Sequence, residues 1–289
     1  MEKIKMKIGV NGASGNLGTA TVKHLLERTV GKHSVVAISR SPEKITIDGV
    51  EARFGDYDQP SSLIESYKGL DRLLLIPSTS LQPGARAVQN IAAIDAAVAA
   101  GVSHIVLMSS AGARNVQKPN IAADYFASEQ HLMRKARQWS ILRMSYYAES
   151  LIEEAQMSLA HGVLTGINEN KVSFVSRDDL AAAAAGLLVG KGHDGAIYTG
   201  TGPESLTGAQ RAEAIAKASG KPLAFITLPA ETLQAQFQQA GLPVEVITAI
   251  VSIQQNFSNG DFDIVTGDIE KLSGRPARNL ESILSTTFQ

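Results

Sequence analysis

The sequence predicts an α/β fold with a doubly wound parallel sheet and a smaller C-terminal lobe. Over the first half of the chain, strand-like apolar segments alternate with helical ones, the order of a parallel sheet covered by helices on both faces. Residues 73–76 are apolar throughout, as expected of a central parallel strand. The first strand, residues 6–10, leads directly into three glycines spaced three residues apart and then into a helix.

The elements of the first half follow from local patterns. Pro60 begins a helix whose inner face carries Leu63, Ile64 and Tyr67, and Gly101 is a plausible left-handed cap for the helix before it. Strands are predicted at residues 6–10, 34–38, 50–54, 73–76, 104–108 and 140–142. Helices are predicted after Gly18, from residue 60, and at residues 87–100 and 121–136.

The second half is less regular. Strands are predicted at residues 172–175, 196–199 and 223–228, and helices at residues 180–188, 207–220, 230–240 and 243–257. Thr207 is a candidate N-cap, and residues 177–179 form a charged helix start. Because strict alternation stops near residue 150, we expect one domain at residues 1–150 and a smaller lobe at residues 151–289 that is not strictly separable from it.

The three glycines of the first turn are the strongest functional signal. Gly12 allows a tight turn, Gly15 lets backbone amides approach a pyrophosphate, and Gly18 lets the helix pack close to the sheet. The N-terminal amides of that helix then hold the negative charge. This pattern predicts a Rossmann-type dinucleotide site, and the alternative is an ordinary strand-to-helix turn.

Arg40 indicates which dinucleotide is bound. It follows the second strand, where the NAD version of the fold carries an acidic residue for the ribose hydroxyls, and Lys44 lies one turn further on. A guanidinium offers a planar fork of donors to phosphate oxygens. We therefore predict NADP(H) as the cofactor, with Arg40 and Lys44 near its 2′-phosphate. The alternative for Arg40 is a solvated surface side chain.

Composition excludes several classes of protein. The formal net charge is −1, so no basic surface for nucleic acid or an anionic membrane is expected. With no cysteine there is no disulfide, zinc–thiolate site or thiol catalysis, and His131 and His161 lack partners at metal-ligand spacing. Residues 1–5 are charged rather than leader-like, and no apolar stretch is long enough to span a bilayer. A cytoplasmic protein is expected, and a homodimer is left open.

The loops at the carboxyl ends of the strands are where a ligand is expected on such a sheet. Together they are predicted to line one cleft, with the second half of the chain as its far wall. These loops are residues 12–18, 39–44, 56–57, 77–80, 109–112 and 143–149.

A series of motifs resembles one known family. The segments GASGNLG, ISRSPEK, GDYDQPSSL, LLLIPS and WSILRMSYYAES occur in this order, and GINENKVSFVSRDDLAAAAA and SGRPARNLESIL extend the resemblance over nearly the whole chain. The chain thus resembles the NmrA-like atypical short-chain dehydrogenases/reductases. The resemblance implies NADPH in the N-terminal lobe and hydride transfer to a flat conjugated acceptor, such as a quinone or a dye, held between the lobes.

The resemblance also implies roles for individual residues. The residues that match phosphate-binding positions are Gly12, Ser14, Gly15, Asn16, Leu17 and Arg40, and those expected near the adenine are Asp56 and Tyr57. The residues expected beside the ribose and nicotinamide are Ile76, Pro77 and Ser78. The residues expected to border the nicotinamide and the substrate are Arg143, Ser145, Tyr146 and Tyr147. Met144 departs from the family, whose close members carry Asn there, so an amide contact at this position is in doubt. Asn11 stands where Thr is usual.

Acid–base machinery of the usual short-chain dehydrogenase kind is incomplete. Tyr125 is followed four residues later by Glu129 rather than Lys, and a nearby carboxylate would raise the pKa of a phenol. Ser109 and Ser110 lie at the expected strand exit. A Ser–Tyr dyad is one interpretation; the other is that Tyr125 lies on a helix surface and the serines have no catalytic role.

Several residues are candidates for the substrate side of the site. Tyr147 is the candidate catalytic residue, orienting an acceptor oxygen, although a packed tyrosine fits equally well. Phe257 and Phe262 either cap the cleft or pack in the core. The substrate set is Ser110, Tyr125, Met144, Tyr147 and Phe257.

We therefore predict an NADPH-dependent oxidoreductase that passes hydride directly to a quinone or similar conjugated acceptor. Quinones and cationic dyes need little help from a proton donor, because their conjugated systems are already electron-poor, so positioning dominates. Two alternatives stay open: an NADP(H)-sensing regulator without turnover, and a sugar-nucleotide epimerase or dehydratase, against which the missing Tyr-x-x-x-Lys argues.

Overall fold

The computed structural model of the 289-residue chain describes residues 5–82, 84–116 and 120–288, so residues 1–4 of the charged N-terminus lie outside the described ranges. Contacts divide the chain into two compact units. Unit 1 contains residues 1–143, 177–199 and 268–275, and unit 2 contains residues 144–176, 200–267 and 276–289. The domain boundary near residue 150 stays a prediction.

Nearly all of a seven-stranded sheet lies in unit 1. Its strands, in spatial order, are β11 (Ala196–Gly200), β6 (Trp139–Met144), β5 (His104–Ser110), β4 (Arg72–Leu75), β1 (Lys7–Asn11), β2 (Ser34–Ser39) and β3 (Val50–Phe54). β1 pairs in parallel with both β2 and β4. The order reverses at β1, and in such sheets ligands bind at this switch point. The predicted Rossmann-type fold is confirmed.

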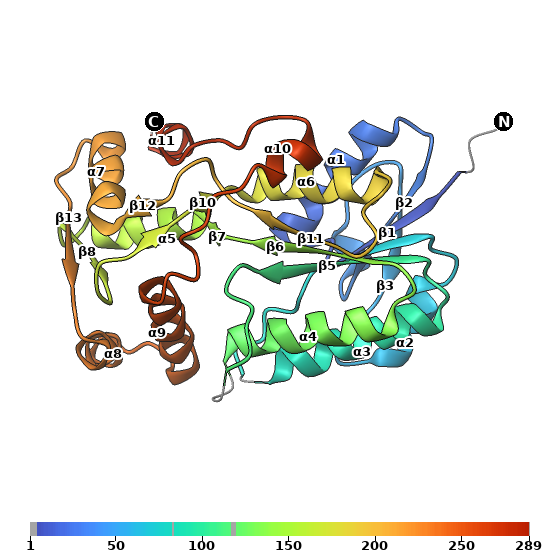
Figure 1. Cartoon of the computed structure of the whole chain (residues 1–289), viewed down its shortest axis with the longest axis horizontal. Helices are drawn as coiled ribbons and strands as arrows, with labels where there is room; N and C mark the ends of the chain where they lie inside the picture. Colours follow the sequence, from blue (N-terminus) through green and yellow to red (C-terminus); the bar gives the residue numbers. More distant parts are fainter. Residues whose placement is uncertain (1–4, 83, 117–119, 289) are drawn as a thin grey trace. The chain divides into compact units, whose positions relative to one another are not determined.

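Helices cover both faces of this sheet (Figure 1). One face carries α1 (Asn16–Thr29) and α6 (Arg177–Val189), which pack on each other, with α10 (Asp268–Ser273) against α6. The other face carries α2 (Pro60–Tyr67), α3 (Ala85–Ala99) and α4 (Ile121–Lys135), while the short helix η1 (Pro42–Lys44) follows β2. The expected Gly101 cap is confirmed by its left-handed φ of 78°.

Strand apolarity explains where the core of unit 1 lies. Leu73, Leu74 and Ile105 are at most 1 % exposed, because parallel strands in the middle of a two-sided sheet bury both faces. Tyr67 of α2 and Ile94 of α3 are fully buried. This packing holds the carboxyl ends of β1, β2 and β4 at one edge of the sheet.

Unit 2 is built from short elements. Its helices are α5 (Ala148–Ser158), α7 (Gly208–Ser219), α8 (Ala230–Gln239), α9 (Val244–Ser258) and α11 (Leu280–Thr287). Its strand pairs are β7 (Tyr146–Tyr147) with β10 (Phe174–Val175), β9 (Lys171–Val172) with β12 (Leu206–Thr207), and β8 (Val163–Gly166) with β13 (Ala224–Thr227). Thr207 caps α7 through a reciprocal capping box, and Gly220 ends it with a φ of 69°, as predicted.

One expectation for the second half is wrong, and several elements were not predicted. The single strand at residues 172–175 is two strands in different sheets, because the Ser173 amide between them donates to the Phe262 carbonyl oxygen. No local pattern in the sequence predicts α5, β8, α10 or α11. These elements are short, and their stability comes from packing rather than from a strong local pattern.

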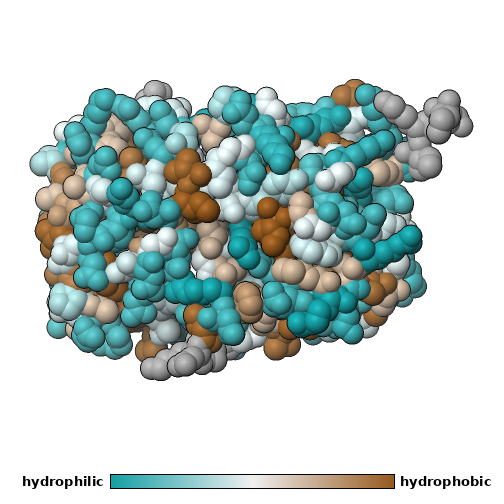
Figure 2. Space-filling model, in the orientation of Figure 1, coloured by the Kyte–Doolittle hydropathy of each residue, from teal (hydrophilic) through white to brown (hydrophobic). Residues whose placement is uncertain are grey.

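Apolar side chains are scattered on the face shown in Figure 2, where brown patches are separated by teal ones. Exposed large apolar residues include Val30, Val88 and Val244. Within the described ranges, no helix combines the length and the apolar character needed to cross a membrane.

Candidate dinucleotide site

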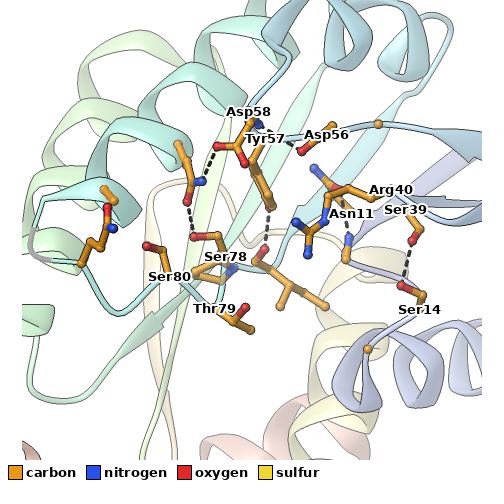
Figure 3. Close-up of a pocket in the computed structure, with 18 residues that line it drawn as sticks. Asn11, Ser14, Ser39, Arg40, Asp56, Tyr57, Asp58, Ser78, Thr79 and Ser80 are labelled. Carbon is orange, nitrogen blue, oxygen red and sulfur yellow. Dashed lines mark hydrogen bonds between the residues drawn. The ribbon is translucent and has the colours of Figure 1, made fainter. Parts of the chain in front are cut away.

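A cavity of about 590 Å³ lies at the carboxyl ends of the first four strands (Figure 3). Asn11 ends β1 and Ser39 ends β2, while Gly55 follows β3 and Ile76 follows β4. The lining residues are Asn11, Gly12, Ser14, Gly15, Ser39, Arg40, Gly55, Asp56, Tyr57, Asp58, Ile76, Pro77, Ser78, Thr79, Ser80, Gln82, Ala85 and Gln89. All belong to unit 1.

The three glycines of this turn have three different roles. Gly12 has a φ of 81°, a conformation that favours glycine. A Cβ on Gly18 would lie 2.2 Å from the Gly12 carbonyl oxygen, so only glycine lets α1 pack this closely. A Cβ on Gly15 would meet the same oxygen at an ordinary 3.5 Å, so the fold itself does not demand glycine there. Since Gly15 lines the cavity, its missing side chain leaves room for a ligand.

The first turn of α1 is suited to an anion. Its N-cap, Gly15, supplies no side-chain cap, and the turn contains no acidic residue. The leading amides of a helix carry partial positive charge and need partners, so a phosphate group is a natural partner here.

Arg40 supplies the positive charge of the cavity wall. Its side chain is exposed, lines the cavity, and makes no hydrogen bond or ion pair within the part of the chain that the structure describes. The Ser14 and Ser39 hydroxyls lie 2.7 Å apart beside it, and the Ser41 amide donates to Ser39 Oγ at 3.0 Å. These hydroxyls hold the glycine turn and the end of β2 together, leaving the guanidinium free for a phosphate.

Tyr57 connects two walls of the cavity. Its hydroxyl donates to the Ile76 carbonyl oxygen at 2.5 Å, which ties the turn after β3 to the loop after β4. Burial raises the pKa of Tyr57, so the phenol stays protonated and keeps donating. Asn11 contributes at the base of the site: its side-chain oxygen Oδ1 accepts from the Gly12 backbone amide at 2.9 Å, and its Nδ2 donates to the buried Tyr67 hydroxyl.

Several predicted residues of unit 1 do not line this cavity. Leu17 and Gly18 are buried in α1, where they shape the turn, and Asn16 begins that helix. Lys44 is exposed at the end of η1. Arg143 forms an ion pair with Glu129, and Ser110 is buried with its hydroxyl accepting from the Gly112 amide at 3.3 Å.

The surroundings of Tyr125 correct the sequence interpretation. Tyr125 is not on a helix surface: it is 4 % exposed, and its hydroxyl accepts from Arg86 Nη1 at 2.7 Å. Burial, and not Glu129, is the main cause that raises the pKa of Tyr125. Glu129 instead accepts from Arg143 and from the Ser109 hydroxyl. A tyrosine with its pKa raised is a weaker acid than the usual catalytic one.

The remaining predicted residues belong to unit 2. The Tyr147 hydroxyl donates to Met144 Sδ at 3.0 Å, and the Ser145 hydroxyl is buried against Ser173. Tyr146 and Phe257 pack edge to face, with ring centroids 4.9 Å apart. Phe262 and Phe174 complete this cluster, so Phe257, at 4 % exposure, has the environment of a core residue.

Four polar residues of the cavity were not predicted as site residues: Asn11, Asp58, Gln82 and Gln89. Asn11 directly precedes the predicted loop 12–18, and Asp58 directly follows the predicted turn 56–57. Both therefore lie at strand ends or in loops that face the ligand, one residue outside the predicted bounds. Gln82 and Gln89 lie in and after the loop that precedes α3, where no motif distinguishes them.

A parallel sheet with a glycine turn, an uncapped helix start and an unpaired arginine at its switch point defines a dinucleotide-binding protein of the Rossmann class. A family model described as NAD(P)H-binding matches residues 12–191, and the chain belongs to this family. This family match, together with the relatives described next, confirms the NmrA-like resemblance and the NADP(H) cofactor inferred from the sequence.

Two known proteins similar to this chain are a quinone oxidoreductase and an azoreductase. Quinone oxidoreductase 2 of Escherichia coli is 30% identical over 285 residues, 97% of this chain and 98% of that protein. The NAD(P)H azoreductase of Xenophilus azovorans is 26% identical and covers 93% of each chain.

Solved structures agree with these relatives. An Escherichia coli NADPH-dependent quinone oxidoreductase in complex with NADPH has a TM-score of 0.90 at 30% identity, covering 98% of this chain and 100% of the other. The Citrobacter sp. triphenylmethane reductase in complex with NADP(H) has a TM-score of 0.87 at 28% identity, with coverage of 98% and 100%. The chain is thus an NAD(P)H-dependent oxidoreductase.

Proposed function

We propose that this protein transfers a hydride from NADPH to a quinone or a similarly conjugated acceptor, cationic dyes included. The buried environment of Tyr125 is the observation that favours this class of acceptor. The residue expected to act as a proton donor is buried against Arg86, and the position that would hold the activating lysine is Glu129, paired with Arg143. A site without a strong acid favours acceptors that take hydride unaided.

The residues of the cavity fit the cofactor. The glycine turn and the first-turn amides of α1 are suited to the pyrophosphate, and the unpaired Arg40 guanidinium to the 2′-phosphate. The Tyr57–Ile76 hydrogen bond holds the loop after β4, residues 76–80, as a fixed wall. These residues bind and orient, which is the protein's share of the work when a cofactor carries the chemistry.

Bound NADPH supplies the hydride, that is, one hydrogen nucleus with two electrons. A quinone that accepts it becomes a hydroquinone anion and takes its second proton from water. A cationic dye that accepts it becomes neutral and needs no proton at all. In both cases the chain has to position the acceptor and exclude competing reactions, without protonating it first.

Tyr147 is the residue that we assign to orienting the acceptor. Its hydroxyl donates to the sulfur of Met144, and a thioether is a weak acceptor. An oxygen of a quinone is a better acceptor than this sulfur, so the hydroxyl gains by turning to the substrate. Met144 would then accept the hydrogen bond of Tyr147 only while no acceptor is bound, and would not itself contact the acceptor.

The acceptor panel that tests this proposal has four members: a quinone, a cationic triphenylmethane dye, a simple ketone and a sugar nucleotide. With NADPH present, we expect oxidation of NADPH above the uncatalysed rate for the first two only. Turnover of the sugar nucleotide, or of the ketone alone, would overturn the acceptor class. NADPH binding without oxidation by any member would favour the sensing regulator.

A further inference from the structure

Gln89 bridges two walls of the cavity. Its Nε2 donates to Asp58 Oδ1 at 2.6 Å, and its Oε1 accepts from the Ser78 hydroxyl. These bonds are the dashed lines that end at Asp58 and Ser78 in Figure 3. Asp58 follows β3, Ser78 follows β4 and Gln89 lies on α3, so three separate elements meet at this side chain.

The partners fix the orientation of the Gln89 carboxamide. A carboxylate only accepts hydrogen bonds, so the amide nitrogen has to face Asp58 and the amide oxygen has to face the Ser78 hydroxyl. The nitrogen carries two hydrogens, and the bond to Asp58 uses one of them. Within the described ranges, no partner is found for the second hydrogen or for Asp58 Oδ2.

These two groups form an ordered pair at the cavity wall: an N–H donor on Gln89 beside a carboxylate acceptor on Asp58. Adenine presents the complementary pair on its Watson–Crick edge, the acceptor N1 beside the donor of its 6-amino group. Hypoxanthine replaces that amino group by a carbonyl oxygen and protonates the neighbouring ring nitrogen, which reverses both polarities.

We propose that Gln89 and Asp58 determine the base specificity of the site by reading the amino edge of the adenine of NADPH. The proposal rests on the proposed function only in placing the dinucleotide in this cavity. Ser78 acts on the base through Gln89, because its hydroxyl holds the carboxamide in the reading orientation. Ser78 is thus a positioning residue.

Calorimetric binding of NADPH and of its hypoxanthine analogue to the whole chain tests the proposal. We expect the wild type to prefer NADPH by about tenfold, the effect of one or two hydrogen bonds. Gln89→Met keeps the length of the side chain but has no amide, and should bring the two affinities to within about twofold of each other. Asp58→Asn still accepts from Gln89 yet offers a donor where adenine needs an acceptor, so it should also lose the preference.

Gln82→Met is the matched control. Gln82 lines the same cavity but has no side-chain hydrogen bond among the described residues, so the ratio of the two affinities should stay at the wild-type value. Thermal unfolding of each variant without nucleotide identifies those that are damaged as folds, and the ratio is compared among folded variants.

Failure of this inference and failure of the proposed site give different results. Equal wild-type affinity for both nucleotides, or an unchanged ratio in folded Gln89→Met, overturns the reading of adenine while leaving the dinucleotide site intact. Binding of neither nucleotide overturns both.

Discussion

Arg143 and Glu129 form a bidentate ion pair. Arg143 Nε donates to Glu129 Oε1 at 2.8 Å and Arg143 Nη2 to Oε2 at 2.6 Å. The Glu129 side chain is completely buried, whereas that of Arg143 is 27% exposed. The Ser109 hydroxyl adds a third hydrogen bond to the same carboxylate at 2.6 Å. The pair joins β6 to α4, so Arg143 has a structural task that sequence comparison does not reveal.

Arg143→Met should destabilise the protein, because it leaves a buried carboxylate without its cation. We expect a loss of about 3 kcal/mol in the free energy of unfolding, measured in urea. The double variant Glu129→Gln with Arg143→Met should recover part of it, since the stranded charge is gone. Weaker NADPH binding at unchanged stability would instead favour the nicotinamide-side role that family resemblance implies for Arg143.

Arg40→Ala should weaken the binding of NADPH far more than that of NADH. A charge-assisted contact contributes about 1.5–3 kcal/mol, which predicts a loss of roughly tenfold to a hundredfold for NADPH and little change for NADH. Calorimetry with both nucleotides measures this, with the exposed Lys44→Met as a comparison at the end of η1. Equal losses for the two nucleotides would contradict the assignment of the 2′-phosphate to Arg40.

Tyr125→Phe should affect stability rather than proton transfer. The variant leaves Arg86 Nη1 without its acceptor in a buried place, at a cost of about 1–3 kcal/mol. Because the pKa of Tyr125 is raised by burial, we expect the pH profile of kcat/KM to be the same with and without the hydroxyl. A loss of about a hundredfold or more in kcat, with a changed pH profile, would show general acid catalysis instead.

His104 should make the fold sensitive to acid. Its Nε2 lies 2.8 Å from Ser140 Oγ, which donates its own proton to the His193 carbonyl oxygen, so Nε2 carries hydrogen and donates to Ser140. Burial lowers the pKa of His104 from 6.5 to about 4. The unfolded chain therefore takes up this proton first, and stability present above pH 6.5 is lost as the pH falls towards 4, by up to about 3 kcal/mol.

Urea unfolding at neutral pH and near pH 5 measures this effect. His104→Gln, which can still donate to Ser140, should lose less stability on acidification than the wild type does. The exposed His161→Gln should behave as the wild type. An identical pH dependence in His104→Gln and the wild type would contradict the role given to this ring.

The sequence predicts unit 1 better than unit 2 for physical reasons. Long apolar strands such as 73–76 and a glycine-marked turn encode their structure locally, so the sheet and the phosphate side of the site follow from them. The split of residues 172–175 depends on Phe262, 89 residues from Ser173, a distance no local pattern spans. The roles of Gln89 and Arg143 depend in the same way on partners from other elements.

Mixing the protein with NADPH and a quinone under anaerobic conditions, while following the absorbance of reduced nicotinamide, tests the central claim most directly. We predict that the absorbance decays only when all three components are present, and more slowly when the transferable hydrogen at carbon 4 of the nicotinamide is deuterium. Firmly bound NADPH whose absorbance persists with every quinone and cationic dye would contradict hydride transfer to a conjugated acceptor.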